Sequence, residues 1–535
     1  MSASSSSRAA LLARLAANDW DLLVIGGGIS GAGVLREAAR LGWKALLIEQ
    51  RDFAFGTSSR SSKLVHGGLR YLKEGQLRTT WHSVRERQRL MREAPELIES
   101  QSFLFADCQG RKPGRHLFEF GLRVYDLMAG TSSHRYVNAG NVAALAPGLR
   151  PPALKGAMSY LDAKTDDARL VLRVLQEARQ DGALALNYLA ARTPVLENGR
   201  VVGMQLEDLE SGRSHTVRAR AVVNATGVWA DRLRGKLDRP PLLRPLRGSH
   251  LVIPAWRLPV AQAISLMHPQ DGRPVFFYPW EGSTLIGTTD IDHVGDLDRE
   301  ASISPAEVDY LLAAVNDQFP GLSLGRADIA ACYAGVRPVV SDGAKAPSAS
   351  GRDHVVLDEQ GMVTVTGGKL TTFRLMALDA LAAVQRQWSQ QTLPGTASAF
   401  PPYRLSDGPV FRPATSLPAS LAPAVARRLA ARFGAQAADV LNDANASELC
   451  FIPGTETLWL ELRHAARHEQ VVHLDDLLLR RVRLGILLPD GGLAHAERIR
   501  SLCQTQLGWS DAQWQQELAR YRSIITSHYS LPANP

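Results

Sequence analysis

A glycine-rich turn near the N-terminus has the residue types and the spacing that bind phosphate groups. The segment Gly26–Gly31 reads Gly-Gly-Gly-Ile-Ser-Gly, follows the apolar run Asp21–Ile25 and precedes Ile29–Leu41, whose composition favours a helix. Glycines at this spacing allow a tight turn, let the backbone approach a pyrophosphate and let the helix pack closely on the sheet. The helix N-terminus then faces the phosphates. The sequence therefore predicts a dinucleotide site whose motif glycines are Gly26, Gly28 and Gly31.

An acidic residue ends the next predicted strand. Lys44–Glu49 is a second apolar run, so a β-α-β unit ends at Glu49, roughly 20 residues beyond the turn. A carboxylate at this place accepts hydrogen bonds from the adenosine ribose hydroxyls and repels a 2′-phosphate, which disfavours NADP. NAD and FAD share this pattern. The segment Ala225-Thr226-Gly227, which follows the predicted strand Ala221–Asn224, resembles the second FAD-contacting segment of flavoproteins with two dinucleotide-binding domains, and it favours FAD.

Further motifs occur along the chain in a fixed order. They are Gly56–Leu72, Asp166–Leu170, Gly248–His250, Gly287–Asp290, Ala334–Pro338 and Gly367–Arg374. Together these segments resemble the FAD-dependent glycerol-3-phosphate dehydrogenases. The resemblance runs from about Asp21 to Arg374 and continues more loosely through the rest of the chain.

The resemblance implies a set of cofactor contacts. The loop that begins at Thr57 is rich in hydroxyl groups, which can hydrogen-bond cofactor phosphates and flavin edges. Gly67 and Gly68 follow it and allow a close approach of the backbone to a ring. The cofactor-binding residues implied beyond Gly26, Gly28, Gly31 and Glu49 are Thr57, Ser58, Ser59, Ser61, Ser62, Lys63, His66, Ala225, Thr226, Gly227 and Gly368.

The same resemblance implies a substrate site for glycerol 3-phosphate beside the flavin. A phosphate monoester requires fixed positive donors, and arginine offers a bidentate fork. The substrate-binding residues implied are Arg70, Tyr71, Arg337, Lys369 and Thr371.

Oxidation of a secondary alcohol also requires a base that titrates near the working pH, which histidine does. His250 is our favoured base, with His66 as a group on the flavin side. Arg337 and Lys369 would stabilise the developing alkoxide and hold the phosphate. Which of the two histidines abstracts the proton stays open at this point.

These motifs require an α/β fold. We expect a Rossmann-like FAD-binding domain, an antiparallel-sheet substrate (cap) domain and a C-terminal all-helical domain. The expected bounds are a frayed N-terminal extension over residues 1–20, the FAD-binding domain interleaved with the cap over 21–395 and the helical domain over 396–535. The cap is expected mainly over residues 75–150 and 240–340.

Local patterns support this division. Pro274–Pro279, Ser283–Gly287 and His354–Leu357 read as strands of the cap sheet. A stretch rich in Pro, Ser, Thr and Gly over residues 393–413 marks the boundary before the helical domain. Helical periodicity beyond it is found in Pro423–Phe433, Leu458–His468 and Asp475–Leu484.

Composition limits the class of protein. The chain has 535 residues, 45% of them hydrophobic and 21% charged, which is typical of a folded protein of two or three domains. Its four cysteines lack metal-binding spacing, so we expect neither disulfides nor a metal. No apolar run reaches the roughly 18 residues of a membrane-spanning helix. The net charge of +8 favours an anionic partner: a phosphorylated substrate, nucleic acid or phospholipid.

The electron acceptor and the location follow from the resemblance. It implies a membrane quinone and peripheral attachment to the inner face of the cytoplasmic membrane. The segments Arg78–Arg92 and Arg111–Arg123 are basic and partly amphipathic, as expected of a surface that lies on anionic lipid. The sequence leaves the oligomeric state open, with a homodimer as one assembly.

Three alternatives remain at this stage. An oxygen-using glycerophosphate oxidase would share the same motifs. Another FAD enzyme acting on an amino acid or a hydroxy acid could bind its carboxylate through Arg70 or Arg337. A non-catalytic membrane or nucleic-acid binding protein would explain the charge, but no basic tract with interleaved aromatic residues favours nucleic acid.

Overall fold

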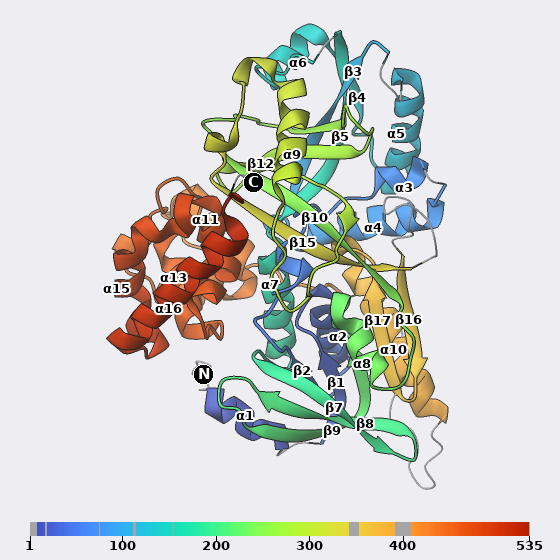
Figure 1. The fold of residues 1–535 in the computed structure, drawn as a ribbon, viewed down its shortest axis with the longest axis vertical. Coiled ribbons are helices and arrows are strands. Elements are labelled where there is room, and N and C mark those ends of the chain that lie inside the picture. Colours follow the sequence, from blue (N-terminus) through green and yellow to red (C-terminus); the bar gives the residue numbers. More distant parts are fainter. Residues whose placement is uncertain are drawn as a thin grey trace.

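The computed structural model describes residues 8–16, 19–73, 75–110, 114–151, 153–341, 353–390 and 408–533. Two sheets and a helical domain make up the molecule, with the helical domain beside the sheets (Figure 1). The first sheet has the order β16 (His354–Glu359), β17 (Met362–Gly367), β9 (Ser214–Asn224), β1 (Trp20–Ile25), β2 (Ala45–Ile48) and β6 (Leu184–Leu186). From β17 to β6 the pairs are parallel, and β16 is antiparallel to β17.

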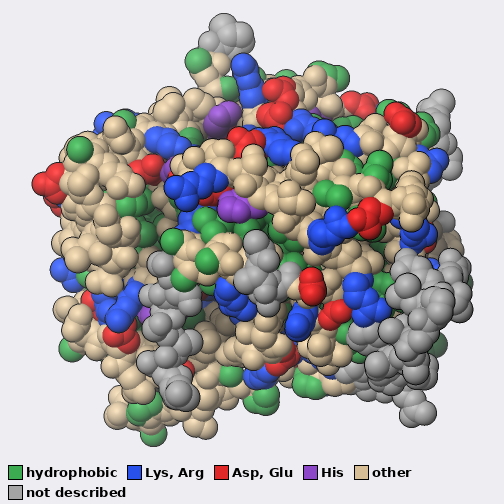
Figure 2. Space-filling model, turned by 90° about the horizontal axis from the view of Figure 1, so that it is seen from below, with side chains coloured by type: hydrophobic (Ala, Val, Ile, Leu, Met, Phe, Trp, Pro, Cys, Tyr) green, Lys and Arg blue, Asp and Glu red, His purple; other side chains and the backbone are tan. Residues whose placement is uncertain are grey.

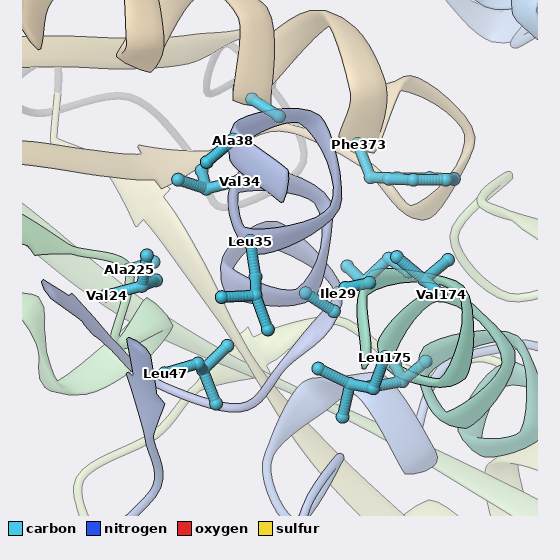
Figure 3. Packing of buried hydrophobic residues seen from close by; sticks show 14 of the residues in the cluster. Val24, Ile29, Val34, Leu35, Ala38, Leu47, Val174, Leu175, Ala225 and Phe373 are labelled. Carbon is cyan, nitrogen blue, oxygen red and sulfur yellow. The ribbon is translucent and has the colours of Figure 1, made fainter. Parts of the chain in front are cut away.

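The central strands are apolar on both faces because both faces are covered. Three helices cover one face: α2 (Ile29–Arg40), α7 (Asp167–Gln180) and α10 (Phe373–Gln390). Figure 3 shows Leu35 of α2 pointing at Val24 and Leu47 of the sheet, with Val174 of α7 on the far side of the helix. A continuous apolar strand is typical of such a buried parallel sheet.

The opposite face is covered by an antiparallel meander and by short helices. The meander joins β7 (Leu189–Glu197) and β8 (Arg200–Asp208) to β9. Helices α1 (Arg8–Ala16) and α8 (Ala230–Gly235) complete this layer, and Leu15 of α1 lies in the same apolar cluster as Leu23. The expectation of a frayed N-terminal extension is therefore wrong for α1, because its apolar side chains pack on the sheet.

The second sheet is mainly antiparallel. Its strands, in order, are β14 (Ile291–Asp292), β10 (Leu243–Pro254), β13 (Ser283–Gly287), β12 (Pro274–Trp280), β11 (Ala263–Met267), β3 (Ile98–Cys108), β5 (Leu154–Thr165) and β4 (Arg135–Asn138), with β15 (Ala331–Val340) also paired to β10. The helices around it are α3 (Leu69–Lys73), α4 (Leu77–Glu93), α5 (Arg115–Ala129), α6 (Ala139–Leu145) and α9 (Pro305–Gln318). His354–Leu357 was expected in this sheet and instead forms β16 of the first sheet, so that prediction is wrong.

The C-terminal domain is helical, as predicted. Its helices are α11 (Pro423–Phe433), α12 (Ala437–Asn442), α13 (Trp459–His468), α14 (Leu484–Leu487), α15 (Ala496–Leu507) and α16 (Asp511–Ile524), with π-helical turns at Asp476–Arg481 and Ile525–Tyr529. Its core is continuous with one face of the second sheet, since Leu478 and Trp514 belong to the same apolar cluster as Tyr278 and Trp280.

Two surface properties bear on the sequence predictions. Among the described residues, no helix is long and apolar enough to cross a membrane. On the face seen in Figure 2, positive and negative side chains are interspersed and form no continuous basic patch. The predicted boundary over residues 393–413 lies mostly outside the described residues.

Candidate active site

The carboxyl ends of three parallel strands bring the dinucleotide motifs together. Gly26, Glu49 and Ala225 directly follow β1, β2 and β9, and the Ala225 amide donates to the Ile25 carbonyl at 2.8 Å. Gly26 has φ +113°, and a Cβ there would stand 2.5 Å from the Ala225 carbonyl oxygen. A Cβ at Gly31 would stand 1.9 Å from the carbonyl oxygen of Gly26. Only glycine fits this turn, and Gly28 caps the N-terminus of α2 immediately after it.

Glu49 lies at the predicted position for ribose recognition. Its carboxylate accepts hydrogen bonds from the amides of Gly27 at 2.7 Å and Arg51 at 2.8 Å. Burial raises the pKa of this carboxyl group, while the two amide hydrogen bonds oppose that rise. Each carboxylate oxygen has a second lone pair with which to accept from a ribose hydroxyl.

The returning segment is fixed by its own side chains. Thr226 donates its hydroxyl to Asn224 Oδ1 at 2.7 Å, and Gly227 takes φ +59°. The Gly227 carbonyl accepts from Thr366 of β17 at 3.2 Å, which ties β9 to the end of β17. Gly368 follows β17 with φ +70°, and a Cβ there would stand 2.5 Å from Met376 Sδ.

The loop Thr57–Lys63, named the cofactor loop here, connects the two sheets. Ser58 Oγ accepts the Ile29 amide at 2.9 Å, so this hydroxyl stands at the N-terminus of α2, where a pyrophosphate is expected. Thr57 Oγ1 donates to the Val336 carbonyl of β15 at 2.5 Å. Ser62 Oγ lies 2.9 Å from His250 Nε2. The loop therefore spans the distance from the dinucleotide turn to the predicted base.

The remaining residues of the cofactor loop face inward. Ser61 donates to Asp167 through its amide at 3.0 Å and its hydroxyl at 2.8 Å. Lys63 is fully buried and donates to Asp167 at 2.8 Å and to the Ser59 carbonyl at 3.0 Å. Their predicted contacts with the cofactor stay predictions. The Asp166–Leu170 motif carried no assigned role in the sequence, yet Asp167 is the acceptor that holds this loop.

Two neighbouring strands and a glycine at position 287 fix the place of His250. It pairs with Gly287 of β13 on one side and Tyr333 of β15 on the other. A Cβ at Gly287 would stand 2.1 Å from His250 Cδ2, so glycine at this position makes room for the ring. The imidazole stacks on Tyr333 with ring centroids 4.6 Å apart.

The surroundings of His250 lower its pKa. Burial, then the charges of Arg337 and Lys63, hold this pKa well below the usual 6.5. The imidazole is therefore unprotonated near pH 7 and keeps a free lone pair, but it is a weaker base than an ordinary histidine.

Arg337 lies on β15, which pairs with the strand β10 that carries His250. Its Nη1 is 2.9 Å from Asp290 Oδ1, and its Nη2 donates to Thr288 Oγ1 at 3.0 Å. A Cβ at Gly248 would stand 2.3 Å from Arg337 Nη2, so this glycine makes room for the guanidinium. The motifs Gly248–His250, Gly287–Asp290 and Ala334–Pro338, far apart in the sequence, thus form one cluster.

A second group of predicted residues gathers where α3 and α4 meet the turn Leu370–Thr372 that precedes α10. Lys369 Nζ lies 3.4 Å from the centroid of the Tyr71 ring and donates to Ser83 Oγ at 3.2 Å. Thr371 Oγ1 donates to the His66 carbonyl at 3.1 Å. The side chain of Arg70 lies outside the described residues. His66 connects this group to the first, because it lies four residues after Ser62, just beyond the cofactor loop.

The arrangement fits FAD. One edge of the sheet holds a glycine turn that a Cβ would fill, the carboxylate of Glu49, a hydroxyl at the N-terminus of α2 and the segment that returns after β9. Doubly wound folds bind dinucleotides at this edge. No group of three or more metal-ligating side chains is found among the described residues.

Comparison with known proteins identifies the class. Residues 21–376 match the model of the FAD-dependent oxidoreductases, and residues 378–514 match the model of the C-terminal domain of alpha-glycerophosphate oxidase. The fold and the site together define an FAD-dependent oxidoreductase, and FAD is its cofactor.

Individual relatives narrow the class to a family. Glycerol-3-phosphate dehydrogenase 2 of Mycobacterium tuberculosis is 34% identical over 99% of this chain and 92% of its own length. Aerobic glycerol-3-phosphate dehydrogenase of Bacillus subtilis is 37% identical over 70% of this chain and 68% of its own length. The structure of the glycerol-3-phosphate dehydrogenase of Bacillus halodurans with FAD covers 98% of both chains at 29% identity, with a TM-score of 0.76. The chain belongs to the FAD-dependent glycerol-3-phosphate dehydrogenase family.

A more distant structure shows which part of the fold is shared widely. Glycine oxidase of Bacillus cereus, 18% identical with a TM-score of 0.52, matches 68% of this chain and 96% of its own. At this identity the likeness concerns the fold alone.

Proposed function

We propose that this enzyme oxidises sn-glycerol 3-phosphate to dihydroxyacetone phosphate. The observation that carries the proposal is the cluster of a neutral, buried His250 beside Arg337, joined to the cofactor loop through Ser62. It contains a base for an alcohol and a fixed cation for an anionic substrate. The names of the relatives supply the identity of the substrate.

The residues divide the chemistry between them. His250 Nε2 accepts the proton of the substrate C2 hydroxyl, with the Ser62 hydroxyl as the relay because His250 itself is only 1% exposed. Arg337, oriented by Asp290 and Thr288, opposes the negative charge that develops on that oxygen.

Lys369 and Tyr71 lie in the second group and bind the phosphate end. FAD, held by the Gly26–Gly31 turn, Glu49 and the cofactor loop, would supply flavin N5 as the acceptor for the hydride that leaves substrate C2, and a second acceptor would reoxidise it.

We propose that the second acceptor is a membrane quinone and that the enzyme lies on the anionic inner face of the cytoplasmic membrane. The support is a surface formed by α4 and α5, which pack against each other. Its exposed apolar side chains are Leu77, Trp81, Leu117, Phe120 and Leu127. Arg78, Arg85, Arg115 and Arg123 are exposed on the same helices. Large apolar side chains among arginines suit a helix pair that rests in the headgroup region of anionic lipid.

The α4–α5 surface differs in part from the sequence prediction. Arg87 belongs to the basic stretch Arg78–Arg92 predicted to lie on lipid, but it is buried and paired with Asp162 at 2.6 Å. Arg89 pairs with Glu93 at 2.6 Å. Lys112 lies outside the described residues.

One anaerobic experiment tests substrate and acceptor in turn. Purified holoenzyme is mixed with sn-glycerol 3-phosphate, and bleaching of the flavin absorbance is followed; glycine and lactate serve as the amino-acid and hydroxy-acid comparisons. We expect bleaching with glycerol 3-phosphate alone. The reduced enzyme is then offered a quinone analogue or oxygen. Fast reoxidation by oxygen would favour an oxidase, and a colourless protein that binds no FAD would contradict the enzyme proposal as a whole.

A further inference from the structure

A buried cluster of charges lies directly beneath the cofactor loop. Lys63 is 0% exposed, and its ammonium group lies 5.1 Å from the Trp280 ring and 4.8 Å from the Tyr333 ring, in addition to its bonds to Asp167 and Ser59. A charge at this depth is tolerated only when it is paired and hydrogen-bonded.

The C-terminal domain contributes a second cation to this cluster. Arg483 is 1% exposed, and its Nη2 donates to the Ser59 carbonyl at 2.6 Å and lies 3.3 Å from Asp167 Oδ1. It has φ +65°, which is uncommon for a residue other than glycine and indicates that its surroundings dictate its conformation. Arg483 thus spans from the helical domain to the backbone of the cofactor loop, more than 400 residues away in sequence.

The contacts of Arg483 continue to the catalytic cluster. Asp167, which Arg483 approaches, accepts both the amide and the hydroxyl of Ser61. Tyr333 donates to the Ser61 carbonyl at 2.9 Å and stacks on His250. The next residue, Ser62, reaches His250 Nε2. A shift of the loop at Ser59 or Ser61 would therefore change the position of both Ser58 and Ser62.

We propose that Arg483 is a positioning residue through which the C-terminal helical domain holds the cofactor loop, with Ser58 at the N-terminus of α2 and Ser62 against His250. The part that concerns His250 rests on the proposed function, whereas the part that concerns FAD binding does not. Arginine suits the task because Nη2 meets the Ser59 carbonyl and Asp167 while Nε, at another point of the same planar group, lies 3.8 Å from Asp166 Oδ1. Lysine keeps the charge but presents a single point of contact.

The environment of Lys63 agrees with this role. Burial, followed by the charge of Arg483, lowers the pKa of Lys63 to about 8, while Asp167 opposes the decrease. Asp167 therefore serves both cations, and removal of Arg483 leaves it paired with Lys63.

The test compares two buried arginines of the same domain. Arg483→Met removes the contact with the loop. Arg463→Met is the matched control, since Arg463 is also buried but bonds within the helical domain, to Glu448 at 2.9 Å and Asp443 at 3.0 Å. Both full-length proteins are measured by amide hydrogen exchange of the peptide that covers residues 57–63, and by the dissociation constant for FAD.

We expect faster exchange in residues 57–63 and about tenfold weaker FAD binding for Arg483→Met, since a hydrogen bond from a charged group is lost. Arg463→Met should leave both unchanged even if it lowers the unfolding temperature. For Arg483→Lys, both the exchange rate and the FAD dissociation constant should lie between those of the wild type and Arg483→Met. This variant is used instead if Arg483→Met does not fold.

Wild-type exchange and FAD affinity in a folded Arg483 variant would overturn the proposal, as would equal changes in the Arg463 control. Neither measurement uses glycerol 3-phosphate. An enzyme that fails to oxidise glycerol 3-phosphate but shows the expected loop response would overturn the proposed function and leave the role of Arg483 intact.

Discussion

Single glycines decide whether the proposed catalytic side chains have room. His250 and Arg337 occupy the volume that a Cβ would fill at Gly287 and Gly248, respectively. Both glycines have φ outside the left-handed region, so space and not backbone conformation explains their presence. The glycines of these motifs therefore shape the site as directly as its charged residues do.

Replacement of Gly287 by alanine should displace the His250 ring. The added Cβ would stand 2.1 Å from His250 Cδ2, and relief of such crowding typically costs about 1–3 kcal/mol. We expect a slower rate of flavin reduction by substrate and a lower unfolding temperature, measured by stopped flow and by thermal unfolding. The control is Gly235→Ala, whose Cβ meets no atom within 4 Å. Equal rates for Gly287→Ala and the wild type would show that the ring does not need this space.

Replacement of His250 by asparagine tests the base. General base catalysis contributes about 10²–10⁴-fold, so we expect flavin reduction to slow by at least that lower factor. His268→Asn is the control, because His268, directly after β11, is an equally buried histidine that stacks on Tyr310. If His250→Asn reduced its flavin at the wild-type rate, His66 would become the better candidate.

The pH dependence of the wild type provides an independent test of His250. A base is lost when it is protonated, and the pKa of His250 lies well below 6.5 because of burial and then of Arg337 and Lys63. The acid limb of the flavin-reduction rate should therefore fall below pH 6.5. Stopped-flow measurements between pH 5 and 8 would show it, and a midpoint above 6.5 would contradict the assignment.

At the scale of the elements, the sequence predicted single strands and helices better than it predicted which distant strands pair. The sequence predicted the first β-α-β unit, because the hydrophobic period, the spacing of the glycines and the acidic Glu49 at its end all agree. Its parts are the strand Asp21–Ile25, the helix from Ile29 and the strand Lys44–Glu49. The strand at His354 was also recognised, but not its sheet. Its hairpin with β17 is local, whereas the pairing of β17 with β9 joins residues far apart in sequence.

The sequence also does not show which side chains of an amphipathic helix are buried. The basic character of α4 was evident from the sequence, but Arg85 is exposed while Arg87 pairs with Asp162 in the interior. Composition identifies that a helix is basic, and only its packing shows which arginines remain on the surface.

The α4–α5 surface should bind anionic vesicles. Each arginine near an anionic membrane contributes about 1 kcal/mol, so Arg85→Glu combined with Arg123→Glu should weaken binding at least about 30-fold. Arg427→Glu, on the exposed side of α11 in the helical domain, is the matched control. Binding is measured by cosedimentation with vesicles that contain phosphatidylglycerol. Equal binding by the double variant and the control would contradict this orientation on the membrane.

At the scale of the whole molecule, buried ion pairs join the helical domain to the FAD-binding domain. Asp52 accepts from Arg480 at 2.5 Å and from Arg481 at 2.6 Å, with all three side chains buried. The sequence could not predict these pairs, because the partners are more than 400 residues apart and charged residues in helices are usually placed toward solvent. Removal of one partner from such a pair typically costs about 3–5 kcal/mol.

His473 makes this domain contact sensitive to pH. Its Nδ1 lies 2.9 Å from Glu517 of α16, and its Nε2 lies 3.4 Å from Glu210, just beyond β8. Burial lowers the pKa of His473, but the hydrogen bonds with Glu210 and Glu517 outweigh burial and raise it to about 10. Because the folded-state pKa lies above the unfolded value near 6.5, the stabilisation is fully present below pH 6.5 and is lost as the pH rises toward 10.

Replacement of His473 by glutamine should therefore lower the unfolding temperature most at pH 6, less at pH 8 and very little near pH 10. Thermal unfolding of wild type and variant at these pH values measures the difference. His116→Gln, exposed on α5, is the control and should show no such trend. A difference that stays constant from pH 6 to 10 would mean that the charge of His473 does not stabilise the contact and that its ring acts only through packing on Tyr188.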